Sequence, residues 1–356
     1  MTIIIQILGI SIGFGFLVFI HELGHFLAAR ACKVRILTFA FGFGPDLIKH
    51  THNGTKYCIK TIPFGGFVSM AGDNADTATG AADEYLSMKW YKKVFICFTG
   101  PISNYILAIF LFAFVFSIWG VTTISKTSSI GGVVENKPAA QAGIISGDRI
   151  KSIDGVAVNT WRKMMENLKN KADKQAVFAV ERGTYTFDVT MTVDKNPVTG
   201  AGVIGIAPLI EKSEAGFLKS VYLGVEESAV QTFLTVAYLI DKLLSLEKPD
   251  ISGPIGIMKL MGDRTKSGIA DYLKFLAVIS VALGMFNLFP IPMIDGGMIV
   301  LFVIEGIIRK QISTKVVQIY NTIGLIFVIG IFVFATYSDL LRLGVGKLFG
   351  KQGLGF

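Results

Sequence analysis

Long apolar segments alternate with polar, charged segments along this chain. A helix needs about 20 mostly apolar residues to cross the hydrocarbon core of a bilayer. Four segments meet that requirement, at Ile3–Ala29, Val94–Trp119, Tyr272–Ile294 and Val316–Tyr337. The pattern therefore predicts a polytopic α-helical membrane protein with about four transmembrane helices.

Two polar connections between these segments are rich in lysine and arginine. One joins the first two spans, and the other is the stretch RKQISTK at 309–315, which contains no acidic residue. Basic connections favour the cytosolic side of a membrane. With four spans, this prediction places both termini and the long connection after the second span on the opposite side.

The long connection after the second span has a different composition, because charged residues occur throughout it. The stretch YTFDVTMTV, at Tyr185–Val193, alternates apolar and polar residues as a β-strand does. Asp154-Gly155 is a turn dipeptide, and a short helix is expected to bury Trp161, Met164, Met165 and Leu168 on one face. The pattern GGVVENKPAAQAGIISGDRIKSIDGVAVNTW at 132–161 resembles a PDZ domain. This resemblance implies a domain that binds an extended peptide or a C-terminal segment by adding a strand to its sheet.

The residues after this domain, at 216–246, are amphipathic to apolar but carry several charges. We expect a pair of helices on the membrane or on the β-rich domain rather than a fifth span.

The expected organisation follows from these patterns. The chain divides into transmembrane helix 1 (1–30), a cytosolic-side glycine-rich loop and strand region (31–91), transmembrane helix 2 (92–119), a periplasmic PDZ domain (121–210), amphipathic helices with a linker (211–269), a broken transmembrane helix 3 (270–308), a cytosolic loop (309–315), transmembrane helix 4 (316–338) and a tail (339–356).

Composition agrees with a membrane protein, because 52% of the 356 residues are apolar and only 17% are charged. The net charge of +8 does not indicate nucleic-acid binding, since basic residues beside membrane spans give the same total and no basic patch with interleaved aromatics is visible. The three cysteines form no CxxC pair, so neither a disulfide framework nor a cysteine zinc site is indicated.

The first apolar segment contains FIHELGH, in which His21 and His25 are four residues apart and flank Glu22. On a helix the two histidines share one face, as in the H-E-x-x-H arrangement of zinc hydrolases. Two imidazoles then hold the metal and the carboxylate acts as general base. Ionisable residues inside a membrane span cost about 2.5–3.5 kcal/mol each, so this cluster indicates a function rather than chance.

A catalytic zinc site usually has three protein ligands. The nearby acids, all in loop-like sequence, are Asp46, Asp73, Asp76, Asp83 and Glu84. Asp295 in NLFPIPMIDGG is the better candidate, because Pro290 and Pro292 break the helix and irregular backbone at membrane depth indicates an aqueous pocket. Counting helical rise from the same side of the membrane brings this segment to about the depth of His21.

Several motifs together resemble the bacterial intramembrane metalloproteases of the site-two protease family, in that family's order along the chain. They are HELGH, FGFGP, PFGGFVSM, GPISN, the PDZ pattern, SGPIGI and NLFPIPMIDGG. The resemblance implies that Asp295 is the third zinc ligand, that Glu22 is the base and that Asn287 holds the substrate backbone. It further implies substrate contacts at Pro290, Pro292, Gly42, Gly44, Gly65 and Gly66. One departure is the single PDZ domain, where regulatory members of this family carry two.

The function predicted from these observations is a Zn²⁺ endopeptidase in the bacterial inner membrane that cuts single-span membrane proteins within or near the bilayer. A non-catalytic PDZ adaptor is the alternative, but an adaptor needs no base beside a metal site. A zinc transporter is a third reading, but it would show paired repeats. His50 and His52 are expected in a solvated loop, and Glu305 at the membrane interface near Arg309.

Overall fold

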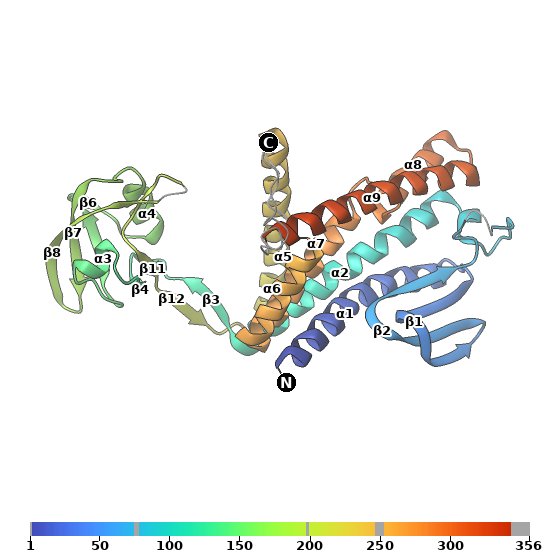
Figure 1. Ribbon diagram of the computed structural model, residues 1–356, viewed down its shortest axis with the longest axis horizontal. Coiled ribbons are helices and arrows are strands. Elements are labelled where there is room, and N and C mark those ends of the chain that lie inside the picture. Colours follow the sequence, from blue (N-terminus) through green and yellow to red (C-terminus); the bar gives the residue numbers. More distant parts are fainter. Residues whose placement is uncertain (1, 75–77, 197–198, 246–252, 343–356) are drawn as a thin grey trace, which may run out of the picture. The chain divides into compact units, whose positions relative to one another are not determined.

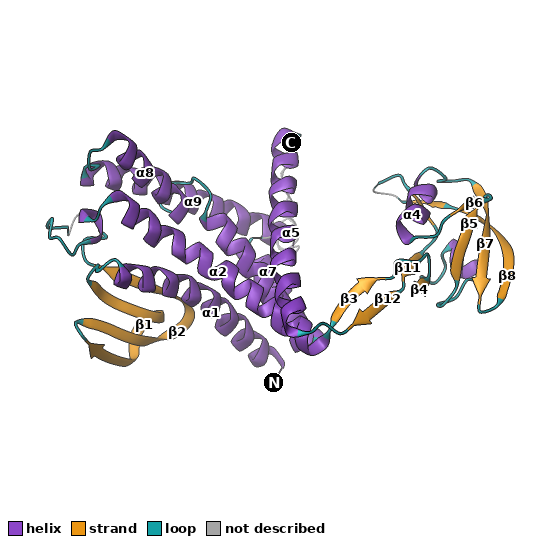
Figure 2. Ribbon diagram, turned by 180° about the vertical axis from the view of Figure 1, so that it is seen from behind, coloured by secondary structure: helices purple, strands orange, loops and turns teal. Residues whose placement is uncertain are grey.

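The computed structural model describes residues 2–74, 78–196, 199–245 and 253–342, and it forms two compact units (Figure 1). One unit contains Met1–Ile118 together with Gly216–Phe356, and the other is Trp119–Ala215. The first unit is mostly helical and the second is mostly β-strand, as Figure 2 shows.

Four helices in the described ranges are long and apolar enough to span a membrane: α1 (Thr2–Ala31), α2 (Trp90–Trp119), α7 (Ile269–Asn287) and α9 (Thr314–Arg342). Their order matches the expected one, whereas their ends differ. The helix α2 starts before the expected Val94, and α9 continues to Arg342, into the stretch from 339 onwards that was expected to be a tail. Apolar periodicity gives no sharp signal for the last helical turn.

The third membrane segment is two helices rather than one. The helix α7 stops at Asn287, and α8 (Asp295–Ile308) begins only after a non-helical connection that contains Pro290 and Pro292. Proline lacks the N–H that a helix interior requires, and Met293 adopts a positive φ of 76°. The break therefore places Asp295 in the first turn of a new helix.

Residues 31–91 contain a two-stranded β-sheet, formed by β1 (Ile36–His52) and β2 (Thr55–Met70). Residues 56–59 face 48–51 and also 38–41, while 66–70 face 36–41. The hairpin is thus folded back on itself, and the segment 66–70 pairs with the sheet on one side only. A 3-10 turn at Tyr85–Ser87 precedes α2.

The sequence predicted a pair of helices on the membrane or on the β-rich domain, whereas the structure has one helix in the described residues here, α5 (Phe217–Leu244), which packs against α2. A Cβ on Gly224 would lie 2.8 Å from the carbonyl oxygen of Ile109, so the two backbones approach closely. Further along, the Tyr105 hydroxyl lies 3.1 Å from that of Thr232. In agreement with the prediction, α5 is not among the helices that qualify as spans in the described residues.

The helix α6 (Pro254–Ser267) is capped by a residue of α9. The backbone N–H groups of Gly253 and Gly256 donate to the two carboxylate oxygens of Asp339, at 3.0 and 2.8 Å. Ser252, the first residue of the SGPIGI motif, lies outside the described residues. This cap ties the end of α9 to the start of α6.

The β-rich unit is closed at its ends by β3 (Val121–Ile124) pairing with β12 (Ile210–Ser213). Its remaining strands are β4 (Ile130–Val133) with β11 (Ile206–Pro208), β9 (Asp194–Lys195) with β10 (Gly202–Val203), and a four-stranded sheet in the order β6 (Val156–Ala157), β5 (Arg149–Ile153), β7 (Gln175–Arg182) and β8 (Tyr185–Thr192). The short helices α3 (Pro138–Gln141) and α4 (Trp161–Lys169) complete it.

Local signals in this unit agree with its structure in most places. Asp154 and Gly155 have φ values of 51° and 76°, as a tight hairpin turn requires. On α4, Met164 and Leu168 are fully buried, but Met165 is 37% exposed and not on the buried face as expected. The buried face of α4 is therefore narrower than its apolar residues predicted.

Candidate metal centre

The helix α1 presents His21 and His25 on one face, one turn apart. Their ring centroids are 4.8 Å apart, their Nε2 atoms are 3.1 Å apart, and the residues are only 8% and 7% exposed. Glu22 lies between them in sequence, and its Oε2 accepts a hydrogen bond of 3.1 Å from the backbone N–H of Val68 in β2. The strand therefore holds this carboxylate at the edge of the histidine pair.

Asp295 reaches the same point from α8. Its Oδ2 lies 3.0 Å from His21 Nε2, and its Oδ1 lies 3.3 Å from His25 Nε2. His21, His25 and Asp295 form the one group of three or more metal-ligating side chains found in the described part of the chain. Residues 274 positions apart in sequence thus meet, because the broken third segment starts a new helix at the carboxylate.

The donor set fits a zinc ion. Zinc–nitrogen and zinc–oxygen bonds of about 2.0 Å in a tetrahedron place neighbouring donor atoms about 3.3 Å apart. The three donors here are separated by 3.0–3.3 Å. His25 also has the outer bond that metal-binding histidines make, since its Nδ1 lies 2.7 Å from the carbonyl oxygen of Ile96. That bond leaves Nε2 of His25 bare toward the other two donors.

The motif GPISN in α2 forms the wall behind the histidines. A Cβ on Gly100 would lie 2.3 Å from His25 Nε2 and 2.9 Å from a ring carbon of His21, so only glycine fits there. On the facing helix, a Cβ on Gly24 would lie 2.3 Å from the Ser103 hydroxyl oxygen. The two glycines let α1 and α2 approach closely enough for α2 to contact the histidine rings.

The residues expected to bind substrate occupy two segments near this centre. Asn287 is the last residue of α7, and Pro290 and Pro292 lie in the connection that leads to Asp295. The carbonyl of Pro292 also lies 2.3 Å from where Gly324 in α9 would carry a Cβ. This connection therefore packs against α9.

The four glycines expected to contact substrate lie in β1 and β2, and the backbone conformation or the lack of space explains why each position requires glycine. Gly42, Gly44 and Gly65 have φ values of 88°, 88° and 105°, a region that disfavours residues with a Cβ. Gly66 has no room for a Cβ, which would lie 2.6 Å from the carbonyl oxygen of Ala40. These glycines let the hairpin fold back on itself beside α1.

The acids in the 31–91 region make local contacts away from the histidine pair. Asp46 binds Lys56 and Lys60 at 2.5 and 2.9 Å, and these hydrogen bonds hold its pKa at about 2. Asp83 pairs with Arg35 at 2.8 Å.

Hydrogen bonds from Thr79 and Gly80 lower the pKa of Glu84. Asp73 accepts from the Met70 N–H at 2.9 Å, and Asp76 lies outside the described residues. The described acids are therefore committed to hydrogen bonds within their own region.

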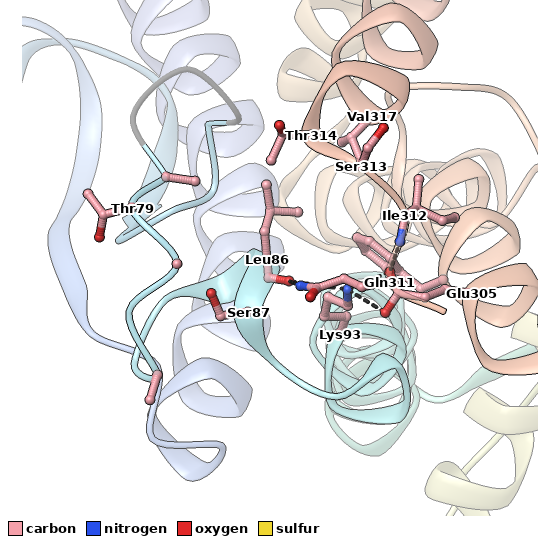
Figure 3. Close-up of a pocket in the computed structure, with 14 residues that line it drawn as sticks. Thr79, Leu86, Ser87, Lys93, Glu305, Gln311, Ile312, Ser313, Thr314 and Val317 are labelled. Carbon is pink, nitrogen blue, oxygen red and sulfur yellow. Dashed lines mark hydrogen bonds and ion pairs between the residues drawn. The ribbon is translucent and has the colours of Figure 1, made fainter. Parts of the chain in front are cut away.

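Glu305 corrects the sequence interpretation. It was expected at the interface near Arg309, but it is 6% exposed and its two oxygens lie 2.7 and 2.8 Å from Lys93 Nζ (Figure 3). Lys93 is 1% exposed and lies 4.6 Å from the Phe302 ring centroid. The pair lines a cavity of about 540 Å³ together with Ile312 and other residues. The periodicity of apolar residues could not reveal that Glu305 pairs with Lys93, which lies 212 residues earlier in the chain.

His50 and His52 lie in β1 and not in a loop. Both are exposed, as expected, and their ring centroids are 6.4 Å apart. They belong to no three-residue ligand group in the described ranges.

Comparison with known proteins covers nearly the whole chain. The sequence model described as Peptidase family M50 matches residues 9–331. Two relatives bear the name "Putative zinc metalloprotease": one from Clostridium acetobutylicum is 32% identical over 93% of this chain and 96% of its own length, and one from Rhizobium meliloti is 31% identical over 91% and 93%. Metalloprotease MmpA of Caulobacter vibrioides is 31% identical over 93% and 94%.

Solved structures resemble one part of the chain. The PDZ domain of an SdrC-like protein from Listeria monocytogenes matches 25% of this chain and 94% of its own, at 20% identity and a TM-score of 0.22. The corresponding domain from Listeria innocua matches 23% and 92%, also at 20% identity and a TM-score of 0.22.

Proposed function

Since the chain belongs to peptidase family M50 and is a membrane zinc metalloprotease, we propose that it cuts single-span membrane proteins within or near their transmembrane segments. Regulated intramembrane cleavage of an anti-sigma factor or of a signal-peptide remnant is an example of the proposed activity. The observation that supports the proposal is the position of His21 and His25 inside a candidate membrane span, Gly9–Ala31. A hydrolytic centre at that position faces substrates that are themselves in the bilayer.

We assign the ligand roles to His21, His25 and Asp295. These three side chains would hold a zinc ion, which when bound would supply Lewis acidity toward a peptide carbonyl and lower the pKa of a water molecule. Glu22 takes the proton from the attacking water as its oxygen bonds to the carbonyl carbon. Glu22 then delivers a proton to the nitrogen as the C–N bond breaks, which yields a carboxylate and an amine. Because Val68 N–H occupies Oε2 of Glu22, the other carboxylate oxygen handles the proton.

A helical substrate hides its peptide bonds, so it must unwind before cleavage. The segment 66–70 of β2 supports a way to hold the unwound chain. It pairs with residues 36–41 on one side, while Val68 N–H on the other side points to Glu22. A substrate strand added along this edge would lie beside the base. In this proposal Asn287, Pro290 and Pro292 contact the same substrate from the α7–α8 connection.

We place the protein in the bacterial inner membrane, with the β-rich unit on the extracytoplasmic side. The basic connections at 31–91 and 309–315 support this orientation. In this arrangement the β-rich unit binds a peptide or C-terminal segment of the substrate, in the manner of a PDZ domain, and selects which proteins reach the membrane site.

The test is the substitution Glu22→Gln in the full chain, in detergent or liposomes. The variant should retain zinc, because its three ligands are intact, and should lose cleavage of a model single-span substrate. Mass spectrometry of the wild-type products locates the cut. Full activity of Glu22→Gln would refute the proposed mechanism, and a cut far outside the apolar segment would refute intramembrane cleavage.

A further inference from the structure

Asn104 is a fully buried polar side chain beside the metal centre. It lies on α2, one turn after Gly100 and on the same helix face. Its Nδ2 is placed 3.2 Å from Nδ1 of His21, while its Oδ1 has no hydrogen-bond partner in the described residues. The one hydrogen bond of this amide goes to a candidate metal-binding histidine, so the protonation of that histidine decides which amide atom faces it.

The tautomer of His21 decides which atom of the Asn104 amide faces the imidazole. A neutral imidazole carries one N–H, and the nitrogen that binds a metal must be bare. If Nδ2 of Asn104 donated to Nδ1, the proton of His21 would sit on Nε2, directed at Asp295 Oδ2 only 3.0 Å away. That tautomer blocks the position where the metal binds. The histidine must therefore carry its proton on Nδ1 and donate it outward.

The oxygen and nitrogen of an asparagine amide exchange places by a half turn about one bond, without moving other atoms. After this turn, Oδ1 of Asn104 takes the place of Nδ2, about 3.2 Å from Nδ1 of His21, and accepts its N–H, while Nδ2 takes the place where Oδ1 had no partner among the described residues. The number of hydrogen bonds is the same, so the tautomer that metal binding requires decides the orientation. The arrangement then matches that of His25, whose Nδ1 donates to the Ile96 carbonyl. Both histidines would be oriented by acceptors on the same helix, α2.

We propose that Asn104 is a positioning residue whose Oδ1 accepts the Nδ1–H of His21 and so fixes the metal-binding tautomer. This inference rests on the proposed ligand role of His21. The backbone of Asn104 is itself anchored, because its carbonyl accepts from the Ser280 hydroxyl at 2.8 Å. The anchored backbone keeps the amide within reach of the imidazole, and Gly100 keeps α2 close enough for the bond to form.

Two substitutions of matched shape separate this role from simple packing. Asn104→Leu removes the acceptor, and Asn104→Asp keeps an oxygen facing His21 but removes the amide N–H. Zn²⁺ affinity of the full-length protein, measured in detergent by competition with a chelator, should fall roughly 10–100-fold for Asn104→Leu. It should stay within several-fold of wild type for Asn104→Asp. Ser228→Ala, which removes a buried side-chain hydrogen bond to the Gly224 carbonyl in α5 without touching His21 or Asn104, is the control and should keep its affinity.

Equal losses in Asn104→Leu and Asn104→Asp would overturn the proposal, as would unchanged affinity in Asn104→Leu. A second measurement does not depend on the variants. The chain has only four histidines, so ¹⁵N NMR of labelled, metal-free protein can assign the tautomer of His21. A proton on Nδ1 supports the proposal, and a proton on Nε2 overturns it. Because neither measurement uses peptide cleavage, failure here is distinct from failure of the Glu22→Gln test.

Discussion

Substitution of Glu305 alone should strongly destabilise the helical unit. Glu305→Leu leaves the ammonium of Lys93, which is 1% exposed, without its carboxylate. The remaining contacts are the Leu86 carbonyl at 3.4 Å and the face of Phe302. Removing one member of a buried pair typically costs about 3–5 kcal/mol. The free energy of unfolding should fall by about that amount.

The magnitude follows from two opposing contributions. At 2.7 Å and an effective dielectric constant of about 20, the attraction between the charges is about 6 kcal/mol. Taking the two ions out of water costs several kcal/mol each. The intact pair therefore contributes little net stability, whereas one unpaired ion retains its cost without the attraction. The double variant Lys93→Met/Glu305→Leu should consequently unfold within about 1 kcal/mol of wild type.

Unfolding in mixed micelles with increasing SDS, followed by tryptophan fluorescence, measures these differences. Trp90 is a suitable probe, since its ring packs against Gly306, the residue after Glu305. Lys89→Met, at an exposed lysine one turn before Lys93, is the control and should change stability by less than about 0.5 kcal/mol. The reasoning is refuted if Glu305→Leu matches wild type, or if the double variant loses as much as the two single variants together.

Two further predictions concern acid stability and the metal centre. Arg182 donates two hydrogen bonds to Asp148, at 2.7 and 2.8 Å, and lowers the pKa of that carboxyl below 3.8. The resulting stability of the β-rich unit is present above pH 3.8 and is lost as the pH falls through the lowered pKa. Circular dichroism of the segment 119–215 from pH 6 to 2 should show this loss, and Asp148→Asn should flatten it. Gly100→Ala should reduce bound zinc at least tenfold, because the added Cβ would collide with the His25 ring. The control is Gly330→Ala, whose added Cβ meets no atom within 4 Å and which should bind zinc normally. Equal zinc content in the two variants would contradict the packing argument.

Features that depend on near neighbours in sequence were accessible without the structure. The spacing of His21 and His25 places them on one helix face by the 3.6-residue period alone. The four apolar spans follow from the length of helix that a bilayer requires. The Asp154-Gly155 turn follows from the residues that tolerate positive φ. In each case the physical cause acts within a few residues of the chain.

Features that depend on distant partners were not accessible. No local pattern indicated that Lys93 pairs with Glu305, and polarity alone led to the wrong prediction that Glu305 lies at the membrane interface. The family resemblance implied a strand-like element in this region, but not that residues 56–59 would pair with two different segments. Asn104 is the last residue of the motif GPISN, and no local pattern indicates its contact with His21. Its position one turn after Gly100 was a usable signal, since both residues must then face the same neighbour.

The amino-acid sequence by itself determined the membrane spans, the H-E-x-x-H pair and the helix break at Pro290 and Pro292, because hydropathy, helical period and proline chemistry are local properties. The sequence also pointed to Asp295, but only the tertiary structure brought its carboxylate within 3.0 and 3.3 Å of the two histidine Nε2 atoms and decided which side chains orient the histidines. Those outcomes depend on where α2 and α8 pack against α1. Close packing of membrane helices is set by small residues such as Gly24 and Gly100 acting together across helices, which no single stretch of sequence contains.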